Sequence, residues 1–247
     1  MKRKTMLLKA VSAIGVAALL LTGCSDDGPG SDLPPDGATG DGDGSGNGEV
    51  DMSYTAMRDW KGCDALDDLN PVQEYMGVVE LRSELVNAAI GEGIDAEGAT
   101  CSGLFTLESY QGEVSGTVGD ASILAGVVPW TTEEEASQNF QDRLATWEEN
   151  PSGIGFSDEQ EGELGGEWDE SYYFGANGGS NRYYINAYGR YGKWIVYISL
   201  DFLHDPGLRN DAEPVYPFTQ EEILDWIANE YMPQTQADIL EQIESEQ

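Results

Sequence analysis

The sequence predicts an α+β domain that has an antiparallel sheet of about five strands, helices packed on one face of that sheet, and one disulfide. Residues 194–202 alternate side chains with the period of two that marks a strand. Residues 131–147 and 219–243 repeat apolar side chains at helical spacing. Candidate strands also follow one another with short links, which favours antiparallel over parallel pairing.

The chain begins with the pattern of a secretory signal. A basic tip of Lys2, Arg3 and Lys4 precedes an apolar run over residues 10–21, and small residues stand before Cys24. The run is shorter than the roughly 20 apolar residues that a membrane-spanning helix needs. Residues 1–23 are therefore predicted to be a signal peptide, with a transmembrane anchor as the alternative.

The segment Leu21-Thr22-Gly23-Cys24 resembles the lipobox of bacterial lipoproteins. The resemblance implies that Cys24 carries a diacylglyceryl group with fatty chains such as palmitate and becomes the first mature residue. Two acyl chains hold a protein in a membrane where one chain is marginal. The predicted location is extracytoplasmic, lipid-anchored to the outer face of the bacterial cell membrane. An ordinary cleaved signal peptide is the alternative.

A low-complexity segment follows the proposed anchor. Residues 24–50 are rich in Gly, Asp, Ser and Pro and contain no aromatic residue, so they cannot bury enough apolar surface to fold. We expect a disordered acidic tether that spans about 30 Å as a flexible coil. Residues 51–247 then form a single domain, which is long enough for one buried core.

The charge of the chain is extreme. It has 46 acidic and 12 basic residues, and four of the basic ones lie in the predicted signal peptide, so the mature net charge is −38. Such a field disfavours nucleic acids and anionic lipid headgroups as partners. Cationic partners remain possible. The alternative is that the acidic residues only form a strongly hydrated surface suited to a saline exterior, where counterions screen their repulsion.

Cys63 and Cys101 are the two cysteines of the predicted domain. In an exported chain such a pair indicates a disulfide, because neither a third cysteine nor a nearby histidine could complete a metal site. A redox-active pair is the alternative, but the two cysteines lack the Cys-x-x-Cys spacing typical of that function.

The first half of the domain contains one short helix, two strands and one long helix. Asn70, Pro71 and Gln73 mark a helix start, and Gly77 marks its end. Strands are expected over residues 103–110 and 121–128. The long helix begins at Thr131 and Thr132, with Glu134 and Glu135 behind them. Its predicted core stripe is Ala136, Phe140, Leu144 and Trp147.

The second half contains three strands and a final helix. Residues 170–174, 181–188 and 194–202 have strand patterns separated by Gly-rich turns, and the last of them should be central in the sheet. Thr219 with Glu222 begins a helix that should break at Pro233 and resume afterwards. Its predicted inward residues are Ile223, Trp226, Ile227, Tyr231, Ile239, Leu240 and Ile243.

The stretch Cys63-Asp64-Ala65-Leu66, followed by Asn70-Pro71 and Gly77, is similar to the start of an actinobacterial envelope lipoprotein family of unknown function. The similarity covers the lipobox, this short motif and the general order of helix, sheet and helix. It implies an envelope lipoprotein with an α+β fold, and it supplies no catalytic residue.

Catalytic motifs are absent from the sequence. The only histidine is His204, in a turn after the last strand, and no serine stands in a Gly-x-Ser-x-Gly elbow that could partner it. Zinc chemistry lacks ligands, and no cofactor motif is present. We predict no catalytic residue, no metal and no cofactor. Pairs of carboxylates keep open the alternative of a hydrolase acting on envelope polymers.

Aromatic residues crowd the strands before residue 194. Tyrosines on a sheet with one solvent-exposed face suit a saccharide, an amphiphile or a protein partner. The alternative is that tyrosine is common in strands for structural reasons alone. The predicted function is a non-enzymatic binding domain on a membrane-anchored lipoprotein, with a passive acidic surface protein as a further alternative. The candidate binding face comprises Tyr172, Tyr173, Tyr183, Tyr184, Asn186, Tyr188 and Tyr191.

Overall fold

The computed structural model describes residues 53–110, 117–149 and 153–246. The predicted signal peptide, the lipobox cysteine Cys24 and the tether lie outside the described residues. The domain belongs to a compact unit, Glu49–Gln247. In the described ranges no helix combines the length and the apolar character needed to cross a membrane.

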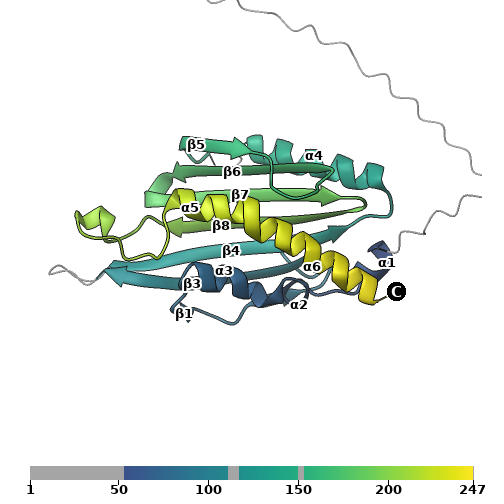
Figure 1. Cartoon of the computed structure of the whole chain (residues 1–247), viewed down its shortest axis with the longest axis horizontal. Helices are drawn as coiled ribbons and strands as arrows, with labels where there is room; N and C mark the ends of the chain where they lie inside the picture. Colours follow the sequence, from purple (N-terminus) through teal and green to yellow (C-terminus); the bar gives the residue numbers. More distant parts are fainter. Residues whose placement is uncertain (1–52, 111–116, 150–152, 247) are drawn as a thin grey trace, which may run out of the picture. The chain divides into compact units, whose positions relative to one another are not determined.

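One antiparallel sheet of eight strands forms the centre of the domain (Figure 1), which confirms the α+β class and the antiparallel pairing. The order along the sheet is β1-β3-β4-β8-β7-β6-β5, and β2 also pairs with β3. The strands are β1 (Glu80–Leu81), β2 (Val86–Ala88), β3 (Ala99–Tyr110), β4 (Thr117–Pro129), β5 (Ser157–Gly162), β6 (Glu170–Gly178), β7 (Arg182–Tyr191) and β8 (Trp194–Leu203).

The expected number of about five strands was too low. The five predicted strands exist and are longer than expected: β4, β6 and β7 continue into Gly-containing sequence that is typical of turns, and β3 begins four residues earlier, at Ala99. The three missed strands are two short segments, β1 and β2, and the acidic β5, whose residues carry no apolar alternation.

Helices precede, interrupt and follow the strands. The elements are α1 (Ser53–Met57), α2 (Gly62–Ala65), η1 (Asp67–Leu69), α3 (Asn70–Tyr75), α4 (Glu133–Glu148), η2 (Gly179–Asn181), η3 (Leu208–Asn210), α5 (Gln220–Trp226), η4 (Ile227–Tyr231) and α6 (Met232–Ser245). The predicted helix starts at Pro71, Thr132 and Thr219 are confirmed within a residue or two. Gly77 follows α3 with a φ of +61°, as a residue that ends a helix should.

Strand β8 is central, as predicted. It pairs with β4 on one side and with β7 on the other, so that Ile198 lies between Ala125 and Ala187. Both faces of β8 are buried along the first half of the strand. The sheet therefore needs a cover on each side.

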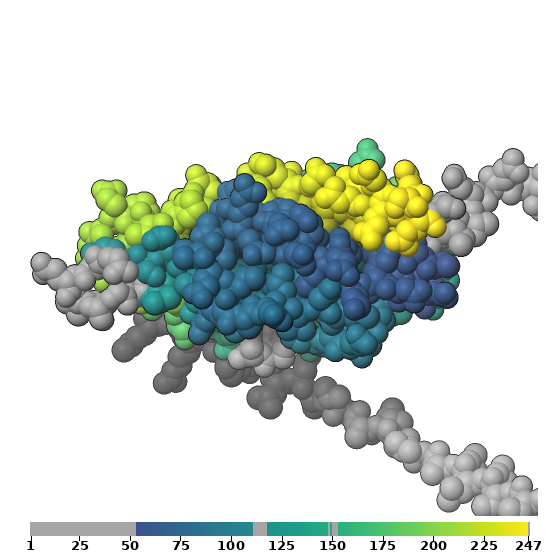
Figure 2. All heavy atoms as spheres, turned by 90° about the horizontal axis from the view of Figure 1, so that it is seen from below, coloured from purple at the N-terminus to yellow at the C-terminus, as the bar shows by residue number. Residues whose placement is uncertain are grey.

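The larger core lies between the sheet and the helices at the two ends of the chain. Trp194, Val196 and Ile198 point into it from β8, and Ile223 and Ile239 enter it from α5 and α6. The two helical ends contact each other directly: Tyr75 of α3 stacks on Trp226 at a ring distance of 4.1 Å. Figure 2 shows the N-terminal and C-terminal segments of the domain, in blue and yellow, side by side on its surface.

Helix α4 covers the opposite face of the sheet, so the prediction of helices on one face only is wrong. Phe140 of α4 packs with Val128, Ile195 and Tyr197, whose side chains project away from the larger core. In Figure 1, α4 lies behind the strands and α6 lies in front of them. The physical reason is β8 itself, because its alternate side chains Ile195 and Tyr197 are as apolar as those that face the first core.

An arginine joins α4 to the sheet. Arg143 donates to Asp95 at 2.7 Å and to Glu97 at 3.0 Å, and its guanidinium lies 5.2 Å from the ring centre of Tyr197. The Tyr197 hydroxyl also donates to Asp95 at 2.9 Å. Burial disfavours ionisation of Asp95, but the hydrogen bond and charge of Arg143 outweigh it and lower the pKa of this carboxyl.

The C-terminal helical segment does not break at Pro233. Helix α5 begins with a capping box, in which the Thr219 N–H donates to Glu222 and the Glu222 N–H donates to the Thr219 hydroxyl. The π-turn η4 then connects α5 to α6, and Pro233 is the second residue of α6. Proline has no N–H to continue the regular ladder, and a local change to wider π pairing removes the need for a break.

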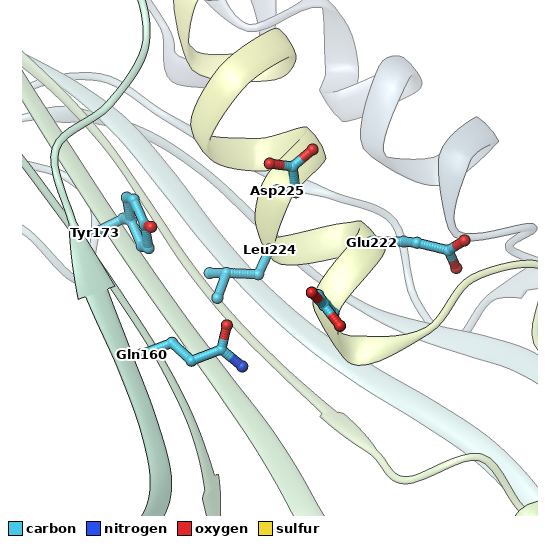
Figure 3. A pocket seen from close by; sticks show the side chains of 6 residues that line it. Gln160, Tyr173, Glu222, Leu224 and Asp225 are labelled. Atoms are coloured by element: carbon cyan, nitrogen blue, oxygen red, sulfur yellow. The ribbon is translucent and has the colours of Figure 1, made fainter.

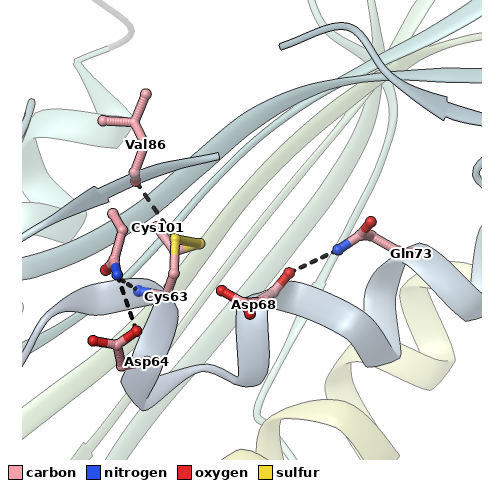
Figure 4. Close-up of a disulfide and its surroundings, with 7 residues drawn as sticks. Cys63, Asp64, Asp68, Gln73, Val86 and Cys101 are labelled. Carbon is pink, nitrogen blue, oxygen red and sulfur yellow. Dashed lines mark hydrogen bonds between the residues drawn. A yellow bond between two sulfur atoms is a disulfide. The ribbon is translucent and has the colours of Figure 1, made fainter. Parts of the chain in front are cut away.

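The disulfide Cys63–Cys101 ties α2 to β3, with the two Cα atoms 4.5 Å apart. Asn87 fixes the helix beside it: its side chain accepts from the Cys63 N–H and donates to Asp64 (Figure 4). Gly62 permits this close approach, because an added Cβ would lie 2.0 Å from the Thr100 carbonyl carbon. The predicted cross-link is confirmed.

We expect loss of the disulfide to lower the free energy of unfolding by about 4 kcal/mol, because a bond across 38 residues constrains the unfolded chain. Urea unfolding of the Cys63→Ala, Cys101→Ala double variant against the oxidised protein measures this change. Alkylation should label neither cysteine until a reductant is added. Labelling of both without reductant would contradict the bond.

We expect Phe140→Ala to destabilise the domain by about 3–5 kcal/mol, because a buried aromatic ring between α4 and the sheet leaves a cavity. Gln138→Ala, on the exposed side of the same helix, should change stability by less than about 0.5 kcal/mol. Urea unfolding compares the two variants. Equal stabilities would show that α4 is not packed on this face.

Candidate functional site

Two neighbouring cavities open where α5 begins. The larger has a volume of about 740 Å³ and the smaller of about 320 Å³. They are adjacent, because Gln160 from β5 and Glu221 from α5 line both, and the two together are called the joined cavity below. Tyr173 and Leu224 line the smaller part from opposite sides, as Figure 3 shows.

The walls of the larger part are mostly apolar. Phe202 of β8 and Phe218 meet edge to face at 5.4 Å, and Tyr216 stacks on Phe218 at 5.4 Å. Leu208 and Pro214 complete this wall. A concave, mainly apolar cavity of this volume with a few polar groups is the usual form of a small-molecule site.

One carboxylate holds the loop that forms this wall. Asp205 accepts hydrogen bonds from the N–H groups of Gly207 and Leu208 at one oxygen, and from those of Val215 and Tyr216 at the other. The two arms of the loop are thereby fixed to a single side chain. The cavity is preformed by its own backbone.

Two buried polar atoms of lining residues have no hydrogen-bond partner within the described residues, namely His204 Nε2 and the Tyr216 hydroxyl. Tyr216 is only 6% exposed, and burial raises the pKa of its hydroxyl. Burial also lowers the pKa of His204, against a hydrogen bond to the Arg182 backbone, and the charge of Arg209 lowers it further.

The charged side chains around the cavity differ in whether they already have hydrogen-bond or salt-bridge partners. Glu222 is used by the cap of α5, where the backbone and hydroxyl of Thr219 lower its pKa. Its side chain points away from Gln160 and Tyr173 in Figure 3. Asp225 accepts from Asn229 at 2.8 Å. Across the described ranges, Glu221 and Arg209 take part in no salt bridge.

Tyr183 lies beneath the smaller part. It is 1% exposed and its hydroxyl is unpartnered in the described part of the chain. Burial, followed by the charge of Glu221, raises the pKa of Tyr183 to about 12. A Cβ added at Gly175 would lie 2.6 Å from this hydroxyl and 2.7 Å from Leu224, so Gly175 makes room for both.

The predicted tyrosine face is divided between the two sides of the sheet. The register of β6 and β7 places Tyr172, Tyr184, Asn186 and Tyr188 on the side of α4. Tyr173, Tyr183 and Tyr191 lie on the side of α5 and α6.

These seven residues do not form one continuous exposed face. Tyr188 stacks on Tyr197 at 5.9 Å, and Asn186 is 3% exposed. Tyr191 is the most exposed of the tyrosines on β7, at 36%. The prediction grouped them as one face, although alternation along a strand puts neighbouring residues on opposite sides, and the sequence did not show that α4 and the final helices cover both sides. Only Tyr173 and the buried Tyr183 are associated with the joined cavity.

Sequence reasoning missed most of the residues that line the cavity. His204 stood out only as the single histidine, and Glu221 was one of 46 acidic residues. Leu208, Arg209 and Tyr216 lie on a loop without a repeating pattern. Within the described ranges, no group of three His, Cys, Asp or Glu side chains is arranged to hold a metal ion.

Compared with known proteins, the chain matches no family model, no curated protein and no solved structure. The similarity to the envelope lipoprotein family therefore stays a prediction.

We expect His204 to make stability depend on pH between about 7.5 and 5.5. Its folded pKa lies below the unfolded value of 6.5, so the unfolded state binds more protons in this window. The contribution is present above the unfolded pKa and decreases as the pH falls. His204→Gln should remove this part of the slope, and urea unfolding of both proteins at the two pH values measures it. Parallel slopes would contradict a lowered pKa.

Proposed function

We propose that the chain is an exported lipoprotein, anchored through lipid on Cys24 to the outer face of the bacterial cell membrane, and that its domain binds a small envelope molecule without catalysis. The joined cavity beside α5 carries the binding part of the proposal. The signal pattern, the lipobox and the Gly-rich segment support the location. The disulfide suits an oxidising compartment.

Binding is favoured over catalysis by the way in which the cavity is built. A catalytic histidine needs a carboxylate that orients it. Asp205, beside His204, is occupied by four N–H groups of its own loop. The remaining wall is aromatic and aliphatic, which suits retention of an amphiphile rather than bond cleavage.

A carboxylate-dependent hydrolase is the second candidate, because Glu221, Glu222 and Asp225 all line the smaller part. Hydrolysis of glycosidic bonds requires two carboxyl groups about 5–10 Å apart on either side of the bond. Incubation with envelope polymers tests this candidate through the release of soluble fragments. Release that is lost in Glu221→Gln would establish the hydrolase, and no release is expected for a binding protein.

The anchor has its own test. The N-terminal peptide of the membrane-bound protein should begin at Cys24 and carry a diacylglyceryl mass, because the thiol of this residue is the predicted acylation site. Cys24→Ser should carry no acyl chain and should leave the membrane fraction. Mass spectrometry of the peptide measures both. A free thiol at Cys24 would overturn the proposed anchor.

The binding proposal is tested by native mass spectrometry of residues 25–247 after incubation with an extract of bacterial envelope lipids and glycans. We expect a retained adduct that is lost in Leu208→Trp, because the larger ring fills the cavity from a residue that is 58% exposed and free of core packing. Leu104→Trp, the same change at an exposed position of β3, is the control. An adduct that both variants retain would place binding elsewhere.

A further inference from the structure

The joined cavity has two chemically different ends. Phe202, Tyr216 and Phe218 surround the larger part with aromatic carbon. Glu221 and Asp225 stand around the smaller part with Tyr173. A ligand that filled both parts would therefore bury an apolar portion at one end and present a polar portion to carboxylates at the other.

Glu221 stands where the two ends meet. It lines both parts, and within the described residues neither a hydrogen bond nor a salt bridge engages its carboxylate. Its negative charge is felt by the buried Tyr183 beneath the cavity. Glu222, its neighbour in the helix, accepts a hydrogen bond from the Thr219 N–H in the helix cap. Of the carboxylates around the smaller part, Glu221 is therefore the one without a hydrogen-bond or salt-bridge partner in the described residues.

One other polar group of the wall also suits a donor. The side-chain oxygen of Gln160 can accept a hydrogen bond from a ligand. Arg209 is the cation of this wall, and it is exposed at the end that carries His204 and Tyr216. Asp225 lines the smaller part and Arg209 the larger part.

From this arrangement we propose that the joined cavity binds a cationic amphiphile. The ammonium head lies between Glu221 and Asp225, beside the face of the Tyr173 ring, and the aliphatic tail lies along Phe202, Tyr216 and Phe218. The strongly negative domain raises the local concentration of such a cation. The inference rests on the proposed binding function and names the chemical class of its ligand.

The test compares two probes with the same tail and opposite heads. Dodecylammonium and dodecanoate are titrated into residues 25–247 by calorimetry, below the concentration at which micelles form and in about 0.15 M salt, which screens surface charge. We expect one saturable site that binds dodecylammonium at least about tenfold more tightly than dodecanoate.

Two matched variants assign the head group. Glu221→Gln should weaken dodecylammonium binding about tenfold, because the charged hydrogen bond is lost. Glu241→Gln, which removes the same charge from an exposed position on α6, should change it less than about twofold. Leu208→Trp should abolish binding of the tail.

Each other outcome has a definite meaning. Tighter binding of dodecanoate that is lost in Arg209→Gln would overturn the cationic class and would leave the binding function standing. Dodecylammonium binding that Glu221→Gln and Glu241→Gln reduce equally would show general surface attraction and would overturn the inference. If neither probe binds and the envelope extract also leaves no adduct, the proposed binding function fails with it.

Discussion

Burial of both faces of β8 is the constraint on which the rest of the fold depends. A strand in the middle of a sheet with apolar side chains on each side cannot face water in either direction. The chain meets this demand with helices from three places: the segment before β1, the long crossover α4 between β4 and β5, and the C-terminal helices after β8. The joined cavity lies where the last of these covers begins, at the loop between β8 and α5.

The scarcity of basic residues shapes the electrostatics of the domain. Arg143, Arg182 and Arg190 each contact two carboxylates, so three side chains hold six acidic groups on the strands and on the loops that adjoin them. An arginine does not always outweigh the effect of burial on a carboxylate. Burial raises the pKa of Asp201 even though Arg182 contacts it. Most of the remaining carboxylates face solvent, where salt screens them.

Local signals predicted five of the eight strands and the starts of three helices, and tertiary contacts decided how these elements pack. The cap at Thr132 and the alternation of residues 194–202 were sufficient to place α4 and β8, because capping and period-two burial are local physics. The side of the sheet that α4 covers depends on contacts between distant segments. The cavity depends on Asp205, whose four hydrogen bonds join the two arms of one loop. A single aspartate in a turn carries no sign of that role in the sequence.

The outer strand β5 influences whether copies of the protein associate at high concentration. All its residues but one are exposed, and Asp158, Glu159 and Glu161 line it with negative charge. An unpaired strand is a template for another sheet, and repulsion between such strands keeps neighbouring molecules apart. The other edge consists of β1 and β2, which are two and three residues long. Salt screens these charges, so high ionic strength would lower the barrier to sheet-to-sheet association between folded molecules.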